Sequence, residues 1–295
     1  MQRLMIPARG GHLAGLNFGR AQGPIDLVFL HATGFNALTY RQLLQPLADR
    51  FRVVALDLRG HGHTMLPARA AFLTHWHPYA ADVVAAIRQL SRGHSLPRLI
   101  AGHSMGATTA LLALAGAPDL AGALLMIDPA VVPPTWRRGL LLPLAPHLLR
   151  RRLPIARSAG RRRDHFGSAA EALASYRGRG AFKTWKPGFL DDYVEDGFAP
   201  QPDGSVRLRC SPAWESATFA GHRHDTFAAL RALRVPARLM AAEKGSTTAG
   251  LLPMIAQAAP AMAIETVAGC THFVPMERPE LVRERMIAMM GVGAS

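Results

Sequence analysis

Short apolar runs alternate with longer amphipathic or alanine-rich stretches along most of the 295-residue chain. The runs have the length of buried strands, and the stretches between them are long enough for helices. Strands are predicted at 12–20, 25–32, 51–60, 96–102, 121–130, 235–243 and 263–272, and helices at 38–49, 77–91, 251–260 and 278–291. Strands that alternate with helices build a mostly parallel, doubly wound sheet with helices on both faces. The pattern therefore predicts an α/β fold.

The stretch from 131 to 230 breaks this alternation. It contains an arginine-rich segment, an aromatic-rich segment (FKTWKPGFLDDYVEDGF) and a hairpin-like turn at Asp203-Gly204. We interpret it as an inserted, largely helical cap domain, with the core formed by 1–130 and 231–295. Because the cap follows a strand that ends at Asp128, it is expected over the carboxyl edge of the sheet, where open α/β sheets bind ligands.

Residues 101–107 read AGHSMGA, in which Gly102 and Gly106 stand two positions on either side of Ser104. The apolar run LPRLIAG before them predicts a buried strand, and MGATTALLALAGAP after them predicts a buried helix. Ser104 is therefore expected on a sharp strand-to-helix turn, where glycine has no side chain to clash. A serine on such a turn presents its hydroxyl as a nucleophile.

Composition changes the picture mainly through charge. The formal net charge is +14, and 31 of the 34 basic residues are arginine. In a chain rich in alanine, glycine and proline, this bias is typical of GC-rich coding, so we predict no nucleic-acid partner. Residues 137–163 hold nine arginines and no acidic residue. Coding bias is expected to explain this segment too. If these arginines do not attract an anionic substrate, kcat/KM should not change with salt.

Four segments, in this order and spacing, resemble the α/β-hydrolase superfamily: HATGF (31–35), DLRGHG (57–62), GHSMG (102–106) and GCTHFVPMERPE (269–280). The resemblance covers about 25–130 and 230–291, and it implies a serine hydrolase of the esterase or lipase kind. Ser104 is then the nucleophile and His272, in a loop past a strand, the base. By the same resemblance, the backbone N–H groups of Met105 and Thr33 form the oxyanion hole.

The acid of the triad has two candidates. Family members usually carry an aspartate after the strand that ends near 243, but Gly245 stands at that position. Asp128, at the end of an earlier buried strand, is the predicted acid because it meets the same rim of the sheet. Glu243 is the alternative, although Lys244 beside it favours a solvated pair.

The predicted activity is hydrolysis of a small carboxylic ester with an apolar acyl or alcohol part, because the cap is rich in apolar residues. One alternative is a C–C bond hydrolase or thioesterase, in which the cap arginines could hold an anionic group of the substrate. The others are an acyltransferase or perhydrolase, and a non-catalytic receptor for a small molecule. The candidate pocket residues are His31, His103, Trp136, Trp185, Phe189 and Trp214. Core packing is an alternative for each aromatic residue, and orientation of loops is an alternative for the two histidines.

No cofactor or metal is expected. The pair His75 and His77 lacks the Asp-His that would continue a metal signature. The N-terminus lacks the apolar core of a signal peptide, and no apolar run is long enough to span a membrane. These features predict a cytoplasmic protein without stable membrane insertion. The oligomeric state is left open.

Overall fold

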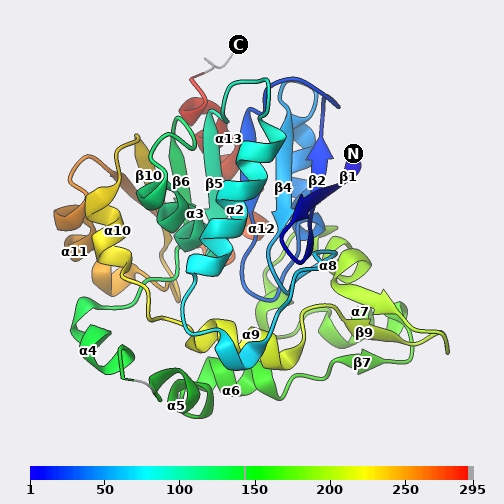
Figure 1. The fold of residues 1–295 in the computed structure, drawn as a ribbon. Helices are drawn as coiled ribbons and strands as arrows, with labels where there is room; N and C mark the ends of the chain where they lie inside the picture. The colour runs from blue at the N-terminus through cyan, green and yellow to red at the C-terminus, as the bar shows by residue number, and fades with distance from the viewer. Residues whose placement is uncertain (143, 292–295) are drawn as a thin grey trace.

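The computed structural model describes residues 1–142 and 144–291. An eight-stranded sheet forms the centre, in the order β1-β2-β4-β3-β5-β6-β10-β11 (Figure 1). The strands are β1 (Gln2–Ala8), β2 (Gly11–Phe18), β3 (Leu27–Leu30), β4 (Val53–Asp57), β5 (Leu99–His103), β6 (Leu124–Ile127), β10 (Ala237–Ala242) and β11 (Ala263–Val267). The pairs β1–β2 and β2–β4 are antiparallel, and the other pairs are parallel. The predicted α/β fold with a mostly parallel sheet is confirmed.

Helices cover both faces of the sheet, and each face has its own apolar core. On one face lie α2 (His77–Leu90), α3 (Met105–Gly116), α10 (Thr226–Ala232) and α11 (Leu252–Ala258). On the other lie α1 (Arg41–Leu44), α12 (Val274–Glu277) and α13 (Pro279–Met289). The strands β3, β4, β5 and β6 are fully buried and apolar except for Asp57 and His103 at the ends of β4 and β5, as expected for strands between two helical layers.

Two core elements differ from the sequence-based prediction. The segment 38–49 forms a 3-10 turn, the short α1 and a second 3-10 turn (Gln45–Leu47) instead of one helix, because Pro46 has no N–H for a helical hydrogen bond. Strand β1 was not predicted. It pairs with β2 through a tight turn at Gly10 and Gly11, both with positive φ.

Residues 131–230 lie mostly at the carboxyl end of the parallel strands (Figure 1). They form α4 (Arg137–Leu140), α5 (Ala145–Arg152), α6 (Pro154–Gly160), α7 (Ala169–Tyr176), α8 (Phe189–Gly197) and α9 (Pro212–Ala220), with a small antiparallel sheet of β7 (His165–Phe166), β9 (Val206–Leu208) and β8 (Phe198–Pro200). The β8–β9 pair joins across the turn predicted at Asp203-Gly204. Helix α10 packs on α3 and α11, so the end of the inserted segment touches the core.

Within the described ranges, no helix is both long enough and apolar enough to cross a membrane.

Candidate active site

Ser104 lies between β5 and α3 in a strained backbone conformation, with φ 53° and ψ −117°. A positive φ is costly for a residue with a Cβ and is typical of functional turns. The flanking glycines make the turn possible: a Cβ on Gly102 would lie 2.4 Å from the carbonyl carbon of Gly106, and one on Gly106 would lie 2.2 Å from the carbonyl oxygen of Leu30. The predicted strand–turn–helix is therefore dictated by backbone contact.

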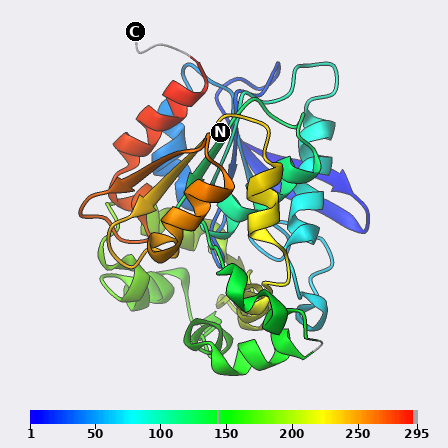
Figure 2. The same ribbon diagram turned by 90° about the vertical axis from the view of Figure 1, so that its left-hand side faces the viewer.

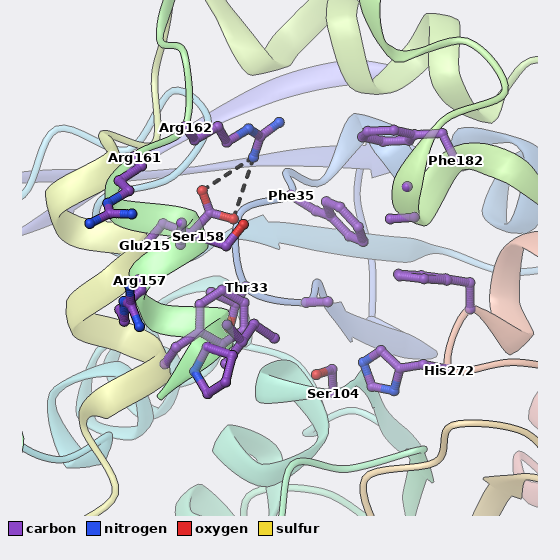
Figure 3. Close-up of a pocket in the computed structure, with 18 of the residues that line it drawn as sticks. Thr33, Phe35, Ser104, Arg157, Ser158, Arg161, Arg162, Phe182, Glu215 and His272 are labelled. Atoms are coloured by element: carbon purple, nitrogen blue, oxygen red, sulfur yellow. Dashed lines mark hydrogen bonds and ion pairs between the residues drawn. The ribbon is translucent and has the colours of Figure 1, made fainter. Parts of the chain in front are cut away.

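Asp128 and His272 come together although 144 positions separate them. The Nδ1 atom of His272 lies 2.5 Å from Oδ2 of Asp128. Asp128 follows β6 and His272 lies beyond β11, so the parallel strands bring both to the rim that carries Ser104. Figure 3 shows the imidazole of His272 directed toward Ser104, and both residues line one cavity. With Nδ1 held by Asp128, Nε2 is the ring atom left to face the serine.

The Asp128 carboxylate is fully buried and receives several hydrogen bonds. Oδ1 accepts from the Ala242 N–H (2.9 Å) and the Ser246 hydroxyl (2.5 Å), and Oδ2 accepts from the Thr247 N–H (3.2 Å). Burial alone would raise the pKa of Asp128, but the hydrogen bonds from His272, Ser246 and Ala242 hold this pKa below its usual value. Asp128 is thus an anion that can hold an imidazolium.

Glu243 lies elsewhere. Its side chain is exposed, and Oε2 accepts the N–H of Gly269 (2.9 Å). The segment after Glu243 still contributes to the site, because the loop that carries Gly245 supplies Ser246 and Thr247 as donors to Asp128. The structure thus brings Asp128, and not Glu243, to His272.

The loop after β3 presents three successive backbone N–H groups near the serine. The Ala32 N–H donates to the Tyr40 hydroxyl and the Gly34 N–H to Nε2 of His61, each at 3.1 Å. Between them, the Thr33 N–H has no hydrogen-bond acceptor among the described residues, and Thr33 lines the cavity with Ser104. Met105 starts α3, where N–H groups have no partner within the helix. Within the described part of the chain, both N–H groups are therefore without a backbone or side-chain acceptor.

His31 and His103 are fully buried and hold loops rather than line the cavity. Tyr40 is the residue that the sequence did not point to: its hydroxyl lies 2.8 Å from Nδ1 of His103, whose Nε2 lies 2.8 Å from the carbonyl oxygen of His272. Burial lowers the pKa of His103 to about 3, so its ring is neutral and can donate from one nitrogen and accept at the other. The chain of hydrogen bonds through Ala32, Tyr40 and His103 thus ties the loop after β3 to the backbone of His272.

The cavity beside Ser104 and His272 has a volume of about 830 Å³. Its wall combines apolar side chains with polar and charged ones. The side-chain walls include Phe35, Ile155, Tyr176, Phe182, Phe219 and Phe273, together with Arg157, Ser158, Arg161, Arg162 and Glu215. Helices α6 and α9 supply most of the polar side, across from His272 and Phe182 (Figure 3). Residues between 154 and 219 therefore form most of the cavity wall.

Three arginines of the segment 137–163, which coding bias was expected to explain, thus line this cavity. Arg162 is ion-paired with Glu215 (3.2 Å) and also hydrogen-bonds the Tyr176 hydroxyl (3.1 Å). Arg157 and Arg161 are exposed and lie on the same wall. Together with Glu215, these three arginines leave the wall with a net positive charge.

The four aromatic residues proposed for the pocket lie elsewhere. Phe189 and Trp214 are buried core residues, and the Trp214 indole N–H donates to the carbonyl of Arg59 (3.0 Å). Trp185 stands behind the cavity wall, packed edge-on against Phe35 (ring centroids 5.2 Å apart). Trp136 is exposed on the cap. The number of aromatic residues in the sequence does not show which of them line the cavity and which pack behind the lining residues. That depends on how residues 131–230 fold.

The mostly parallel sheet and the serine on a strained strand-to-helix turn are features of the alpha/beta hydrolase class. The model of the alpha/beta hydrolase family matches residues 27–285, and the chain belongs to that family.

Several of the relatives found by sequence are hydrolases or esterases. The 2-(acetamidomethylene)succinate hydrolase of Mesorhizobium japonicum is 26% identical over 263 residues, which cover 89% of this chain and 86% of that protein. An esterase of Mycobacterium tuberculosis is 28% identical over 120 residues, 41% of this chain and 37% of that protein. A crystal structure of E-2-(acetamidomethylene)succinate hydrolase matches with a TM-score of 0.79 at 24% identity over 99% of both chains. At that identity the structural likeness shows the shared fold.

Proposed function

We propose that the protein is a serine hydrolase that cleaves a small carboxylic ester or related acyl compound through an acyl-enzyme on Ser104. Three groups support the proposal. They are Ser104 on a strained turn, the His272 imidazole directed toward it, and the buried Asp128 carboxylate, 2.5 Å from Nδ1 of His272. Among them, the Asp128–His272 contact is the observation that favours catalysis most. This contact holds the imidazole in the tautomer whose Nε2 can accept a proton from the serine.

In the proposed mechanism, Nε2 of His272 takes the hydroxyl proton as Oγ of Ser104 attacks the acyl carbonyl carbon. The carbonyl oxygen becomes an oxyanion, which the N–H groups of Met105 and Thr33 stabilise. The imidazolium, held by Asp128, then gives the proton to the leaving alcohol as the C–O bond breaks. Water repeats the same sequence on the acyl-enzyme and releases the acid.

A second candidate differs in the substrate. The positive wall formed by Arg157 and Arg161 favours a substrate that carries a carboxylate away from the scissile bond. The relative that acts on an acetamidomethylene-succinate, a compound with two carboxylates, is consistent with this class of substrate. The apolar side chains on the rest of the wall favour the neutral ester.

A matched pair of substrates separates the two candidates: mono-p-nitrophenyl succinate and its methyl ester, which differ by one charge. If the wall binds a carboxylate, kcat/KM is higher for the charged ester, and the double variant Arg157→Gln/Arg161→Gln lowers this preference about tenfold. Arg151→Gln is the control, because Arg151 belongs to the same segment but does not line the cavity. Equal kcat/KM values for both esters would leave the neutral ester as the substrate class.

A wider panel tests the proposed chemistry itself. Acyl-CoA thioesters and dienone acids in the same assay distinguish a thioesterase or a C–C bond hydrolase, and added alcohol acceptors or peroxide reveal acyl transfer or perhydrolysis. Absence of turnover and of covalent labelling at Ser104 would instead indicate a receptor.

A further inference from the structure

Exposed apolar side chains concentrate on the segment from 134 to 155. Each of them is between 44% and 67% exposed, which is unusual for large apolar residues in one stretch. They are Trp136, Leu141, Leu142, Leu144, Leu148 and Ile155. We call this set the apolar cap face. Both ribbon views place α4, α5 and α6 at the end of the molecule away from the chain's C-terminus (Figures 1 and 2).

A groove of about 790 Å³ runs across the apolar cap face. Its described lining residues are almost all apolar, with leucines from α4, α5 and the segment between them, and Arg152 is the ionisable side chain among those described. Leaving such a groove in water is unfavourable, because each buried CH₂ group contributes about 0.8 kcal/mol when it leaves water. The groove therefore needs an occupant with an apolar part.

The same segment is strongly basic. Between Asp128 and Asp164 the chain has nine arginines and no acidic residue. Arg151 and Arg152 are exposed on α5, whereas Arg157 on α6 and Arg161 just after it are exposed on the wall of the cavity beside Ser104. Exposed apolar and arginine side chains thus lie close together along the chain from Trp136 to Ile155, a mixture that also occurs in segments lying in the interface of a membrane.

The apolar groove and the exposed arginines beside it together favour one kind of binding partner for this face. A second copy of the chain would cover the leucines, but a symmetric contact would bring the exposed Arg151 and Arg152 of each copy near those of the other. A nucleic acid would pair with the arginines but leave the leucines in water. A bilayer surface with anionic lipids accepts both, since its acyl chains take the leucines and its headgroups attract the arginines.

We propose that the apolar cap face docks on the surface of an anionic phospholipid membrane, without inserting a spanning segment. Ile155 belongs both to this face and to the wall of the cavity beside Ser104. Docking would therefore place the cavity next to the lipid, and an amphiphilic substrate could enter from the membrane. Only this last consequence rests on the proposed hydrolase function, and docking itself does not.

Co-sedimentation with sucrose-loaded vesicles tests the docking. The full chain is expected to pellet with vesicles of phosphatidylglycerol and phosphatidylcholine and to stay in solution with phosphatidylcholine alone. Arg151→Gln/Arg152→Gln should weaken binding about thirtyfold, from roughly a factor of five for each charge near an anionic surface. Leu142→Gln/Leu144→Gln/Leu148→Gln should weaken it at least tenfold.

The matched control is Arg92→Gln/Met254→Gln, which removes an exposed charge and an exposed apolar side chain from elsewhere on the molecule and should bind like the parent. Circular dichroism melts and p-nitrophenyl ester turnover confirm that each variant folds and keeps its site. The proposal is overturned if the parent ignores anionic vesicles, or if the leucine variants bind them as well as the parent. A dimer in light scattering that the leucine variants abolish would also overturn it, since a second copy would then occupy the groove.

Discussion

Replacement of Asp128 by asparagine tests whether the Asp128 carboxylate, through Oδ2, orients His272. Asparagine keeps the shape of the side chain and tolerates the left-handed backbone at this position, where φ is 41°. The amide offers one oxygen, whereas the carboxylate serves donors at both oxygens. The backbone N–H of Ala242, 2.9 Å from Oδ1, and the Ser246 hydroxyl both require an acceptor on that side. The amide oxygen is therefore expected there, with the NH₂ group toward His272.

This orientation forces His272 into the wrong tautomer. Nδ1 must then accept a hydrogen bond, so the proton sits on Nε2, which can no longer take the proton of Ser104. The loss of an orienting carboxylate costs roughly 10⁴ in kcat in serine proteases, or about 5.5 kcal/mol of transition-state stabilisation. We expect a loss of that order for Asp128→Asn at pH 7, measured as steady-state kcat on a p-nitrophenyl ester that the parent turns over.

Glu243→Gln is the comparison variant. Glu243 is exposed and accepts the N–H of Gly269, which glutamine can also do through its amide oxygen, so kcat should fall less than tenfold. The reasoning is refuted if Asp128→Asn keeps kcat within tenfold of the parent, or if the two variants rank in the opposite order.

Three further predictions follow from the same structure. Gly106→Ala should prevent correct folding of the serine turn, because its Cβ would meet a backbone carbonyl at 2.2 Å that cannot move; parent-like melting and activity would contradict this. Salt should lower kcat/KM for mono-p-nitrophenyl succinate more than for its methyl ester if Arg157 and Arg161 attract the charge, which replaces the salt insensitivity expected from composition; equal salt slopes would contradict the attraction. Burial lowers the pKa of four histidines from 6.5 to between about 3 and about 4. These residues are His31, His61, His103 and His222. Each takes up a proton on unfolding below pH 6.5, so the free energy of unfolding should fall by up to ~1.4 kcal/mol per pH unit for each histidine between pH 6.5 and about 4. Urea titrations at pH 7, 6 and 5 that gave a constant value would refute this.

The sequence predicted those parts of the fold that short-range physics dictates. The turn at Ser104 is one of them, because Gly102 and Gly106 are required by contacts within the turn and with the adjacent strand. The order of strands and helices also followed from apolar runs. The strand β1 did not, because its partly exposed side chains carry no strong apolar run and its pairing with β2 depends on the turn between them.

The cavity wall could not be predicted from the sequence. Whether Arg157 or Trp185 reaches the cavity depends on how the cap helices pack, and no local pattern encodes that packing. Tyr40 illustrates the same limit inside the core: its hydroxyl bridges Ala32 and His103, residues that only the folded sheet brings together. A tyrosine expected to be buried needs a hydrogen-bond partner for its hydroxyl, but the sequence does not indicate which residue that partner is.

Covalent labelling of Ser104 tests the central claim most directly. The protein is treated with a fluorophosphonate, and intact-mass and peptide mass spectrometry locate the adduct, with Ser104→Ala as the matched variant. The proposed mechanism predicts one adduct per chain, on Ser104, with loss of ester turnover in proportion to labelling, and no adduct on the variant. An unlabelled parent, or full turnover by Ser104→Ala, would contradict the proposal that this serine is the nucleophile.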